Sequence, residues 1–237
     1  MKTIFFDLDD TLYFRRDAFF LAFDEFFGGK HANVKVFTND RCRIRGDEVF
    51  FKCQKGEITE LEMYIFRFKT GFADAGIEIR REEAEDFYKL YKKHLYSMKL
   101  NPQVVSMLDF AKSHFENLGI ITNGHGEHQR NKIKTLGLEN WISSDLIIIS
   151  GEHGCPKPDK ALFKIAQKKS GKNPDELLII GDSFLNDILP ANELGWHTIW
   201  INLYDEDFTS PEYAVKEISE IPLILQSFAN SNSLQAV

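Results

Sequence analysis

Five short, continuously apolar segments constrain the fold of this chain more than any other feature of its sequence. They are rich in Ile, Phe and Leu and occupy residues 3–8, 118–122, 146–150, 177–181 and 198–202. Strands have this composition when helices cover both faces of a parallel sheet. Helical periodicity fills the four connections at 127–136, 160–170, 185–194 and 211–228. This alternation predicts an α/β fold with a doubly wound, Rossmann-like parallel sheet.

The connection between the first two strands breaks this rhythm. It is far longer than a crossover helix requires, and it carries Phe, Tyr and Leu at helical spacings. We therefore expect an inserted helical domain over residues 14–100 and a main domain built from residues 1–13 and 101–228. Asn101-Pro102 marks the return to the main domain, because proline disfavours helix at the residue before it. The small, polar stretch 229–237 predicts a loose tail.

Bulk properties exclude several classes of protein. The 237 residues are 43% hydrophobic and 27% charged, which is typical of a globular protein. The formal net charge of -7 disfavours nucleic acid and anionic membranes as partners. Three cysteines without a CxxC pair, no signal segment and no membrane-length apolar run predict a cytoplasmic protein. The sequence leaves both a monomer and a homodimer open.

Residues capable of chemistry follow four of the five apolar segments. The carboxyl ends of parallel strands meet at one edge of a sheet, so we expect these residues to converge there. The four groups are Asp7-Leu8-Asp9-Asp10-Thr11, Thr122-Asn123-Gly124, Gly154-Cys155-Pro156-Lys157-Pro158, and Gly181-Asp182-Ser183 with Asn186-Asp187 close behind.

These residue types suit phosphoryl transfer. Clustered carboxylates repel one another unless a cation lies between them, and ligation by oxygen alone favours Mg²⁺ over zinc or copper. A lysine and a hydroxyl such as Lys157 and Thr122 can hold phosphoryl oxygens as charge develops on them. One carboxylate can act as the nucleophile, and a second one two residues along can act as general acid and base. The sequence therefore predicts a magnesium-dependent enzyme that acts on a small phosphate ester.

The same residues resemble the four motifs of the haloacid dehalogenase superfamily. The matching pieces occur in order, as Asp7-x-Asp9-x-Thr11, Thr122, Lys157 and Gly181-Asp182-x4-Asp187. Four motifs at four consecutive strand ends are far more specific than one, and the resemblance of the core covers roughly two thirds of the chain. The insertion lies where that superfamily carries its helical C1 cap domain.

The resemblance implies a role for each motif residue. Asp7 is the nucleophile that becomes phosphorylated, and Asp9 is the general acid and base. Thr122 and Lys157 bind the phosphoryl group, and the backbone near Asn123 supplies a further donor. The implied metal ligands are Asp7, Asp9 through its backbone carbonyl, Asp182, and Asp187 either directly or through water.

Asp9 bears on the class of reaction. Dehalogenases of the superfamily attack carbon and lack this acid, so its presence favours hydrolysis of a phosphate ester. Phosphoglucomutase and phosphonate-cleaving activities stay open, as does a sensor or scaffold without catalysis. The intact set of Asp7, Asp9, Lys157 and Asp182 counts against the sensor.

Two further segments bear on the substrate. Ile121-Thr122-Asn123-Gly124 with Gln129 and Lys132-Ile133 is similar to bacterial pyrimidine 5′-nucleotidases and to sialic-acid-9-phosphate phosphatases. Gly56-Glu57-Ile58-Thr59 with Arg67 also resembles the nucleotidase branch. Nucleoside monophosphates are therefore the expected substrates, with sugar phosphates or phosphoserine-type substrates as the alternative.

Overall fold

The computed structural model describes residues 2–203, 205–208 and 211–233. The chain divides into two compact units. The core unit comprises Met1–Tyr13 and Lys99–Val237, and the helical unit comprises Phe14–Met98.

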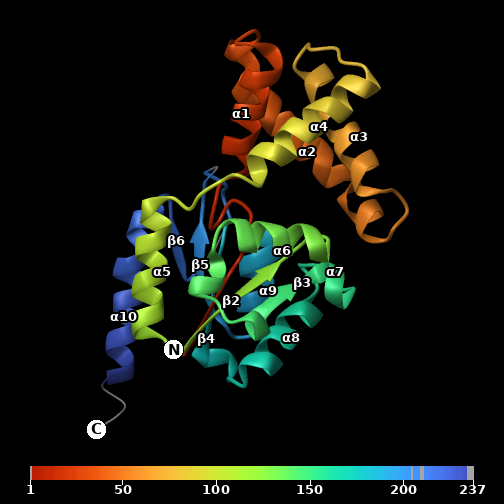
Figure 1. The fold of residues 1–237 in the computed structure, drawn as a ribbon. Helices are drawn as coiled ribbons and strands as arrows, with labels where there is room; N and C mark the ends of the chain where they lie inside the picture. The colour runs from red at the N-terminus through yellow and green to blue at the C-terminus, as the bar shows by residue number, and fades with distance from the viewer. Residues whose placement is uncertain (1, 204, 209–210, 234–237) are drawn as a thin grey trace. The chain divides into compact units, whose positions relative to one another are not determined.

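The core unit is built on a six-stranded parallel sheet in the order β3-β2-β1-β4-β5-β6 (Figure 1). Its strands are β1 (Thr3–Phe6), β2 (Asn117–Thr122), β3 (Ile147–Ile149), β4 (Leu177–Gly181), β5 (His197–Ile201) and β6 (Tyr213–Val215). The pairing places Ile4 of β1 beside Leu118 of β2 and Leu178 of β4. The strand order reverses on either side of β1, so this fold places its ligand site at the carboxyl end of β1.

Helices cover both faces of this sheet. On one side α5 (Pro102–His114) lies beside α10 (Ile221–Ser233), and elsewhere α8 (Lys160–Ser170) packs against α9 (Leu189–Asn192) (Figure 1). Residues from β1, β2 and the last two of these helices form one apolar cluster that includes Phe5, Ile121 and Phe163. Within the described residues of this unit, the other α-helices are α6 (Gly126–Thr135) and the short α7 (Ser150–His153). The predicted doubly wound parallel fold is confirmed.

The start of α5 shows why the chain re-enters the core unit where it does. The side chain of Asn101 accepts a hydrogen bond from the Gln103 N–H, and Pro102 occupies the first turn, where it loses no helical hydrogen bond. The pair that the sequence marks as a boundary is therefore the cap of a helix.

The structure corrects the sequence prediction at the carboxyl end. A single helix was expected over residues 211–228, but Tyr213–Val215 forms β6 and the helix begins only at Ile221. Strand β6 adds to the sheet edge through Ile201 of β5 and Val215, a pairing that helical periodicity cannot reveal. The loose tail expected from residue 229 is also wrong as far as Ser233, because α10 continues to that residue. Residues 234–237 lie outside the described part of the chain.

The helical unit contains α1 (Arg15–Phe27), α2 (Lys35–Gln54), α3 (Glu60–Asp74) and α4 (Arg81–Leu95). A capping box fixes the start of α3, where Thr59 and Glu62 exchange hydrogen bonds. Aromatic rings at helical spacing fill the interior. Phe19, Phe68 and Phe87 are fully buried, and the Phe68 and Phe87 ring centroids lie 4.7 Å apart. The aromatic spacing thus marks a helical core, although Leu61, which lies on the same pattern, is 42% exposed.

In the described part of the chain, no helix is both long and apolar enough to cross a membrane.

An ion-pair cluster joins two helices of this unit. Asp74 at the end of α3 accepts hydrogen bonds from Arg41 Nε at 2.9 Å and from Arg45 Nε at 2.8 Å, both on α2. The Arg45 guanidinium, with help from Arg41, lowers the pKa of Asp74 from 3.8 to about 2. A carboxyl group whose pKa is lower in the folded protein stabilises the fold above its ordinary pKa, and this contribution is lost as the pH falls through the folded value.

Asp74→Asn is therefore expected to lower the thermal stability of the protein above about pH 4, and this difference from wild type should shrink as the pH falls to about 2. Thermal unfolding followed by circular dichroism would measure it. Asp47→Asn, an exposed change on α2, is the matched control. A difference between Asp74→Asn and wild type that stays constant from pH 2 to pH 6 would contradict this role for the ion pair.

Candidate active site

The loop that follows β1 carries the first two carboxylates of the site. Asp7 comes directly after the strand, and its N–H donates to the Ile180 carbonyl at 2.9 Å, so the pairing with β4 extends to this residue. The backbone position of Asp7 is thereby fixed by the sheet itself. Its side chain is buried, with 8% of its surface exposed.

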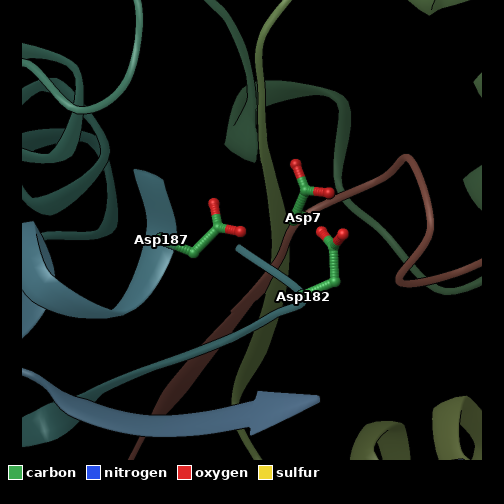
Figure 2. A group of neighbouring side chains, drawn as sticks. All are labelled: Asp7, Asp182 and Asp187. Carbon is green, nitrogen blue, oxygen red and sulfur yellow. The ribbon is translucent and has the colours of Figure 1, made fainter. Parts of the chain in front are cut away.

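Three carboxylates meet at this edge of the sheet. One oxygen each from Asp7, Asp182 and Asp187 lies within 4.8 Å of the other two, and Figure 2 shows the three side chains directed toward one another. Asp182 follows β4 directly, and Asp187 lies in the turn beyond it. A group of oxygen donors at this spacing suits a hard cation such as Mg²⁺ or Ca²⁺.

Lys157 lies between two of these carboxylates. Its Nζ donates to Asp7 Oδ1 and to Asp187 Oδ1, both at 2.6 Å, and to the Ile121 carbonyl at 3.0 Å. Burial opposes the charge on the ammonium, but Asp187 and Asp7 outweigh it and raise the pKa of Lys157 above its ordinary range. The lysine therefore stays charged inside the protein.

The protonation of Asp7 reflects the same crowding. Burial and, to a smaller extent, the carboxylates of Asp187 and Asp9 raise the pKa of Asp7 against the opposing effect of Lys157, and the net result is about 7. Excess negative charge thus remains around Asp7 despite the lysine. A cation bound between the carboxylates would relieve that repulsion, so the donor set fits a divalent metal ion.

Local backbone structure brings Asp187 into the group. Residues Phe184–Ile188 form a wide π-helical turn that directs Asp187 back toward the end of β4. The Ser183 N–H donates to Asp187 Oδ2 at 3.1 Å. A Cβ atom on Gly181 would lie 2.5 Å from the same oxygen, so only glycine lets the carboxylate approach so closely.

The end of β2 contributes Thr122 and Asn123. The Thr122 hydroxyl is fully buried and accepts a hydrogen bond from Gln129 Nε2 at 2.6 Å, which leaves its own hydrogen available to a ligand. The Asn123 side chain binds the Lys157 backbone, accepting from its N–H at 2.8 Å and donating to its carbonyl at 3.0 Å. Asn123 therefore fixes the loop that carries Lys157, and the expected phosphate contact of its backbone N–H stays a prediction.

Asp9 belongs to a second cluster. Its carboxylate accepts hydrogen bonds from Lys132 Nζ at 2.7 Å, from Gln129 Nε2 at 2.8 Å and from the Tyr13 hydroxyl. Among the described residues, the group of carboxylates that could hold a metal ion contains Asp7, Asp182 and Asp187, and the Asp9 side chain stands outside it. The expected metal contact of Asp9 concerns its backbone carbonyl and stays a prediction.

The residues singled out from the sequence thus occupy one end of the sheet, with Lys157 in contact with Asp7 and Asp187. Sequence reasoning gave no role to Tyr13, and it noted Gln129 and Lys132 only as part of a resemblance. Local spacing is the partial signal that the sequence holds for them. Tyr13 follows Asp9 by four residues, and Gln129 and Lys132 share one face of a helix that starts just after β2.

Comparison with known proteins establishes the family. The model of the haloacid dehalogenase-like hydrolases matches residues 4–201, which is most of the chain. This protein belongs to that family. Among curated relatives, it is 28% identical to the pyrimidine 5′-nucleotidase YjjG of Escherichia coli, over 94% of this chain and 96% of the relative. It is 27% identical to the human N-acylneuraminate-9-phosphatase, over 96% of this chain and 94% of the relative.

Solved structures of haloacid dehalogenase-like proteins share the fold. The hydrolase YfnB from Bacillus subtilis, bound to magnesium, has a TM-score of 0.72 at 23% identity and covers 94% of this chain and 98% of its own. The L-2-haloacid dehalogenase from Xanthobacter autotrophicus has a TM-score of 0.73 at 13% identity, with 95% and 98% covered. The helical unit is the cap domain expected of a hydrolase of this family.

Removing the ammonium from the site should destabilise the core unit. Lys157→Met leaves Asp7 and Asp187 buried without their cation, and the expected loss is about 3 kcal/mol in the free energy of unfolding at pH 8 without divalent cations. Urea unfolding followed by tryptophan fluorescence measures it, because all three tryptophans lie in the core unit.

Lys164→Met, an exposed change on α8, is the control for removing one lysine charge from the same unit. A loss of less than about 1 kcal/mol in Lys157→Met would mean that the buried carboxylates do not depend on the lysine.

Proposed function

We propose that this phosphatase is a magnesium-dependent phosphomonoester hydrolase that forms a phospho-aspartate on Asp7 and acts on nucleoside monophosphates. The observation that supports the mechanism most directly is the contact of Lys157 with Asp7 at the end of β1, beside Asp182 and Asp187. The family membership and the nucleotidase among the relatives support the reaction class and the substrate class.

The proposed reaction has two steps. In the first, an Asp7 carboxylate oxygen attacks phosphorus, the ester P–O bond breaks with its electrons going to the leaving oxygen, and Asp9, which enters this step protonated, gives its proton to that oxygen. In the second, water attacks phosphorus, Asp9 takes its proton, and the bond between phosphorus and Asp7 breaks to restore the carboxylate. Lys157 and Thr122 hold the other phosphoryl oxygens through both steps, where negative charge builds up.

The proposed metal site consists of Asp7, Asp182 and Asp187, with the Asp9 carbonyl as a further ligand. When bound there, Mg²⁺ supplies positive charge that offsets the charge of the phosphoryl oxygens. The Asp187 carboxylate also binds Lys157, so it orients the lysine whether or not it contacts the metal.

The substrate class rests on likeness along the whole chain. The nucleotidase and the N-acylneuraminate-9-phosphatase both align over nearly all of this chain, cap domain included. A phosphoserine phosphatase of Thermus thermophilus is 32% identical but aligns over only 66% of this chain. We place nucleoside monophosphates first, with an acidic sugar phosphate as the second candidate.

Phosphate release from a panel of nucleoside monophosphates, sugar phosphates and phosphoamino acids tests this proposal. We expect turnover with Mg²⁺, loss of turnover in EDTA, and a drop of at least about 10⁴-fold in Asp7→Asn, because the nucleophile is gone. Nucleoside monophosphates should give the highest kcat/KM.

The panel also separates the parts of the proposal. Faster turnover of acidic sugar phosphates would replace the substrate class and leave the mechanism intact. Turnover by Asp7→Asn at the wild-type rate would overturn the phospho-aspartate. A folded, Mg²⁺-loaded protein that releases no phosphate from the panel would overturn the nucleoside monophosphate assignment.

Mg²⁺ binding should depend on pH through Asp7. Binding requires the carboxylate, and the pKa of Asp7 is raised to about 7, so the proton competes below that pH. Affinity should fall about tenfold for each pH unit below 7 and level off above it. Isothermal titration calorimetry between pH 5 and pH 9 measures this, and an affinity that is flat from pH 5 to pH 7 would contradict it.

We also propose a cytoplasmic location. Cys42, Cys53 and Cys155 are free thiols in the described structure, as expected for a protein of a reducing compartment.

A further inference from the structure

We propose that Lys132 and Gln129 are positioning residues that hold the Asp9 carboxylate in place for proton transfer. The inference rests on the proposed function, in which Asp9 protonates the leaving group. It concerns two residues that belong neither to the proposed metal site nor to Thr122 and Lys157, the residues proposed to bind the phosphoryl group.

Lys132 is a buried lysine aimed at one carboxylate. Its side chain is 6% exposed, and its Nζ lies 2.7 Å from Asp9 Oδ1 and 3.1 Å from Oδ2. The ammonium also lies 5.9 Å from the centre of the Tyr13 ring, and the Tyr13 hydroxyl donates to Asp9 Oδ1. Burying a lysine is costly unless its charge is paired. If Lys132 only stabilised the fold, any carboxylate could be its partner. Its partner here is Asp9, the proposed general acid.

Gln129 holds the other oxygen of the same carboxylate. Its Nε2 donates to Asp9 Oδ2 at 2.8 Å and lies 2.6 Å from Thr122 Oγ1. Gln129 is 1% exposed, and a Cβ atom on Gly124 would lie 2.8 Å from its side-chain carbons. The glycine after β2 thus leaves room for the amide. The same amide joins Asp9 to the proposed phosphate-binding hydroxyl.

Helix α6 supplies both donors. Gln129 and Lys132 are three residues apart, so they lie on one face of the helix, and each contacts a different oxygen of Asp9 at its shortest distance. A carboxylate held at both oxygens cannot rotate freely about its side-chain bonds. The helix therefore sets the direction of the Asp9 side chain.

Direction matters because another site for a carboxylate lies nearby. Asp9 is two residues from Asp7 and close enough to raise its pKa, yet its side chain stands outside the group of Asp7, Asp182 and Asp187. A carboxylate free to rotate beside a divalent cation would tend to bind it. The hydrogen bonds from the two α6 donors keep the Asp9 side chain from binding the cation, so that it stays available to the leaving oxygen.

The dependence of kcat/KM on the leaving group tests this role. p-Nitrophenolate departs without protonation, whereas an alkoxide needs an acid, so loss of the positioned acid should affect only the second kind of substrate. Lys132→Met should lower kcat/KM about 10- to 100-fold for the best alkyl phosphate of the panel and less than about threefold for p-nitrophenyl phosphate. The ratio of the two values is independent of the fraction of folded enzyme.

Matched variants complete the design. Asp9→Asn should show the same difference between the two substrates, with kcat/KM lowered about 10²- to 10⁴-fold for the alkyl phosphate. The double variant Asp9→Asn/Lys132→Met should lower this kcat/KM no more than Asp9→Asn alone. Lys134→Met, an exposed change on α6, should leave both substrates unaffected. Gln129→Met keeps the volume, removes the amide donor and repeats the test independently of the lysine.

The positioning role would be overturned if Lys132→Met and Gln129→Met lowered kcat/KM equally for both substrates, or if the losses in the double variant were additive. In that case the difference between substrates in Asp9→Asn would still support Asp9 as the acid. Equal losses in Asp9→Asn itself would instead show that Asp9 is not the acid, so that the proposed mechanism fails together with this inference.

Discussion

The buried Lys157 ammonium is the interaction on which the rest of this site depends. It joins the loop after β1 to the turn after β4 by binding Asp7 and Asp187, and it binds the end of β2 through the Ile121 carbonyl. Three neighbouring strands are thus connected by one charge. Without it, two buried carboxylates would face each other in a low-dielectric interior, where their repulsion is strong.

The arrangement around the lysine follows from the parallel sheet. Parallel strands all end at the same edge, so residues far apart in the sequence arrive there together. The side chains at this edge are therefore crowded, and two features accommodate them. Gly181 gives the Asp187 carboxylate room to approach the end of β4, and the Asn123 side chain fixes the backbone of the loop that carries Lys157.

The site separates its acidic residues into two environments. Asp7, Asp182 and Asp187 form a group suited to a cation, whereas Asp9 is bound by Lys132, Gln129 and Tyr13. Carboxylates in different surroundings can have different roles in one reaction, because their partners determine the protonation state and the orientation of each side chain. In this chain, helix α6 supplies Lys132 and Gln129, two of the side chains that bind Asp9.

The sequence by itself determined five strands of the sheet, the helical insertion and the polar residues at the carboxyl ends of the strands. Continuously apolar runs indicate the buried strands, and the spacing of aromatic residues indicates the helices of the cap domain. Asp7, Lys157 and Asp182 come just after strands or in the loops beyond them, and the parallel order of the strands brings those positions to one edge. Strand β6 was missed because three residues at a sheet edge carry no periodic signal of their own, and their pairing partner in β5 defines them.

Only the tertiary structure decided which side chains touch. Nothing in the spacing of Asp9 and Lys132, 123 residues apart, predicts the ion pair between them. Likewise, no role was predicted for the Asn123 side chain, which binds the backbone of Lys157. Sequence patterns report which face of a strand or helix a residue occupies, because that depends on local geometry. Contacts between side chains depend on how separate elements pack, and that is settled only when the chain has folded.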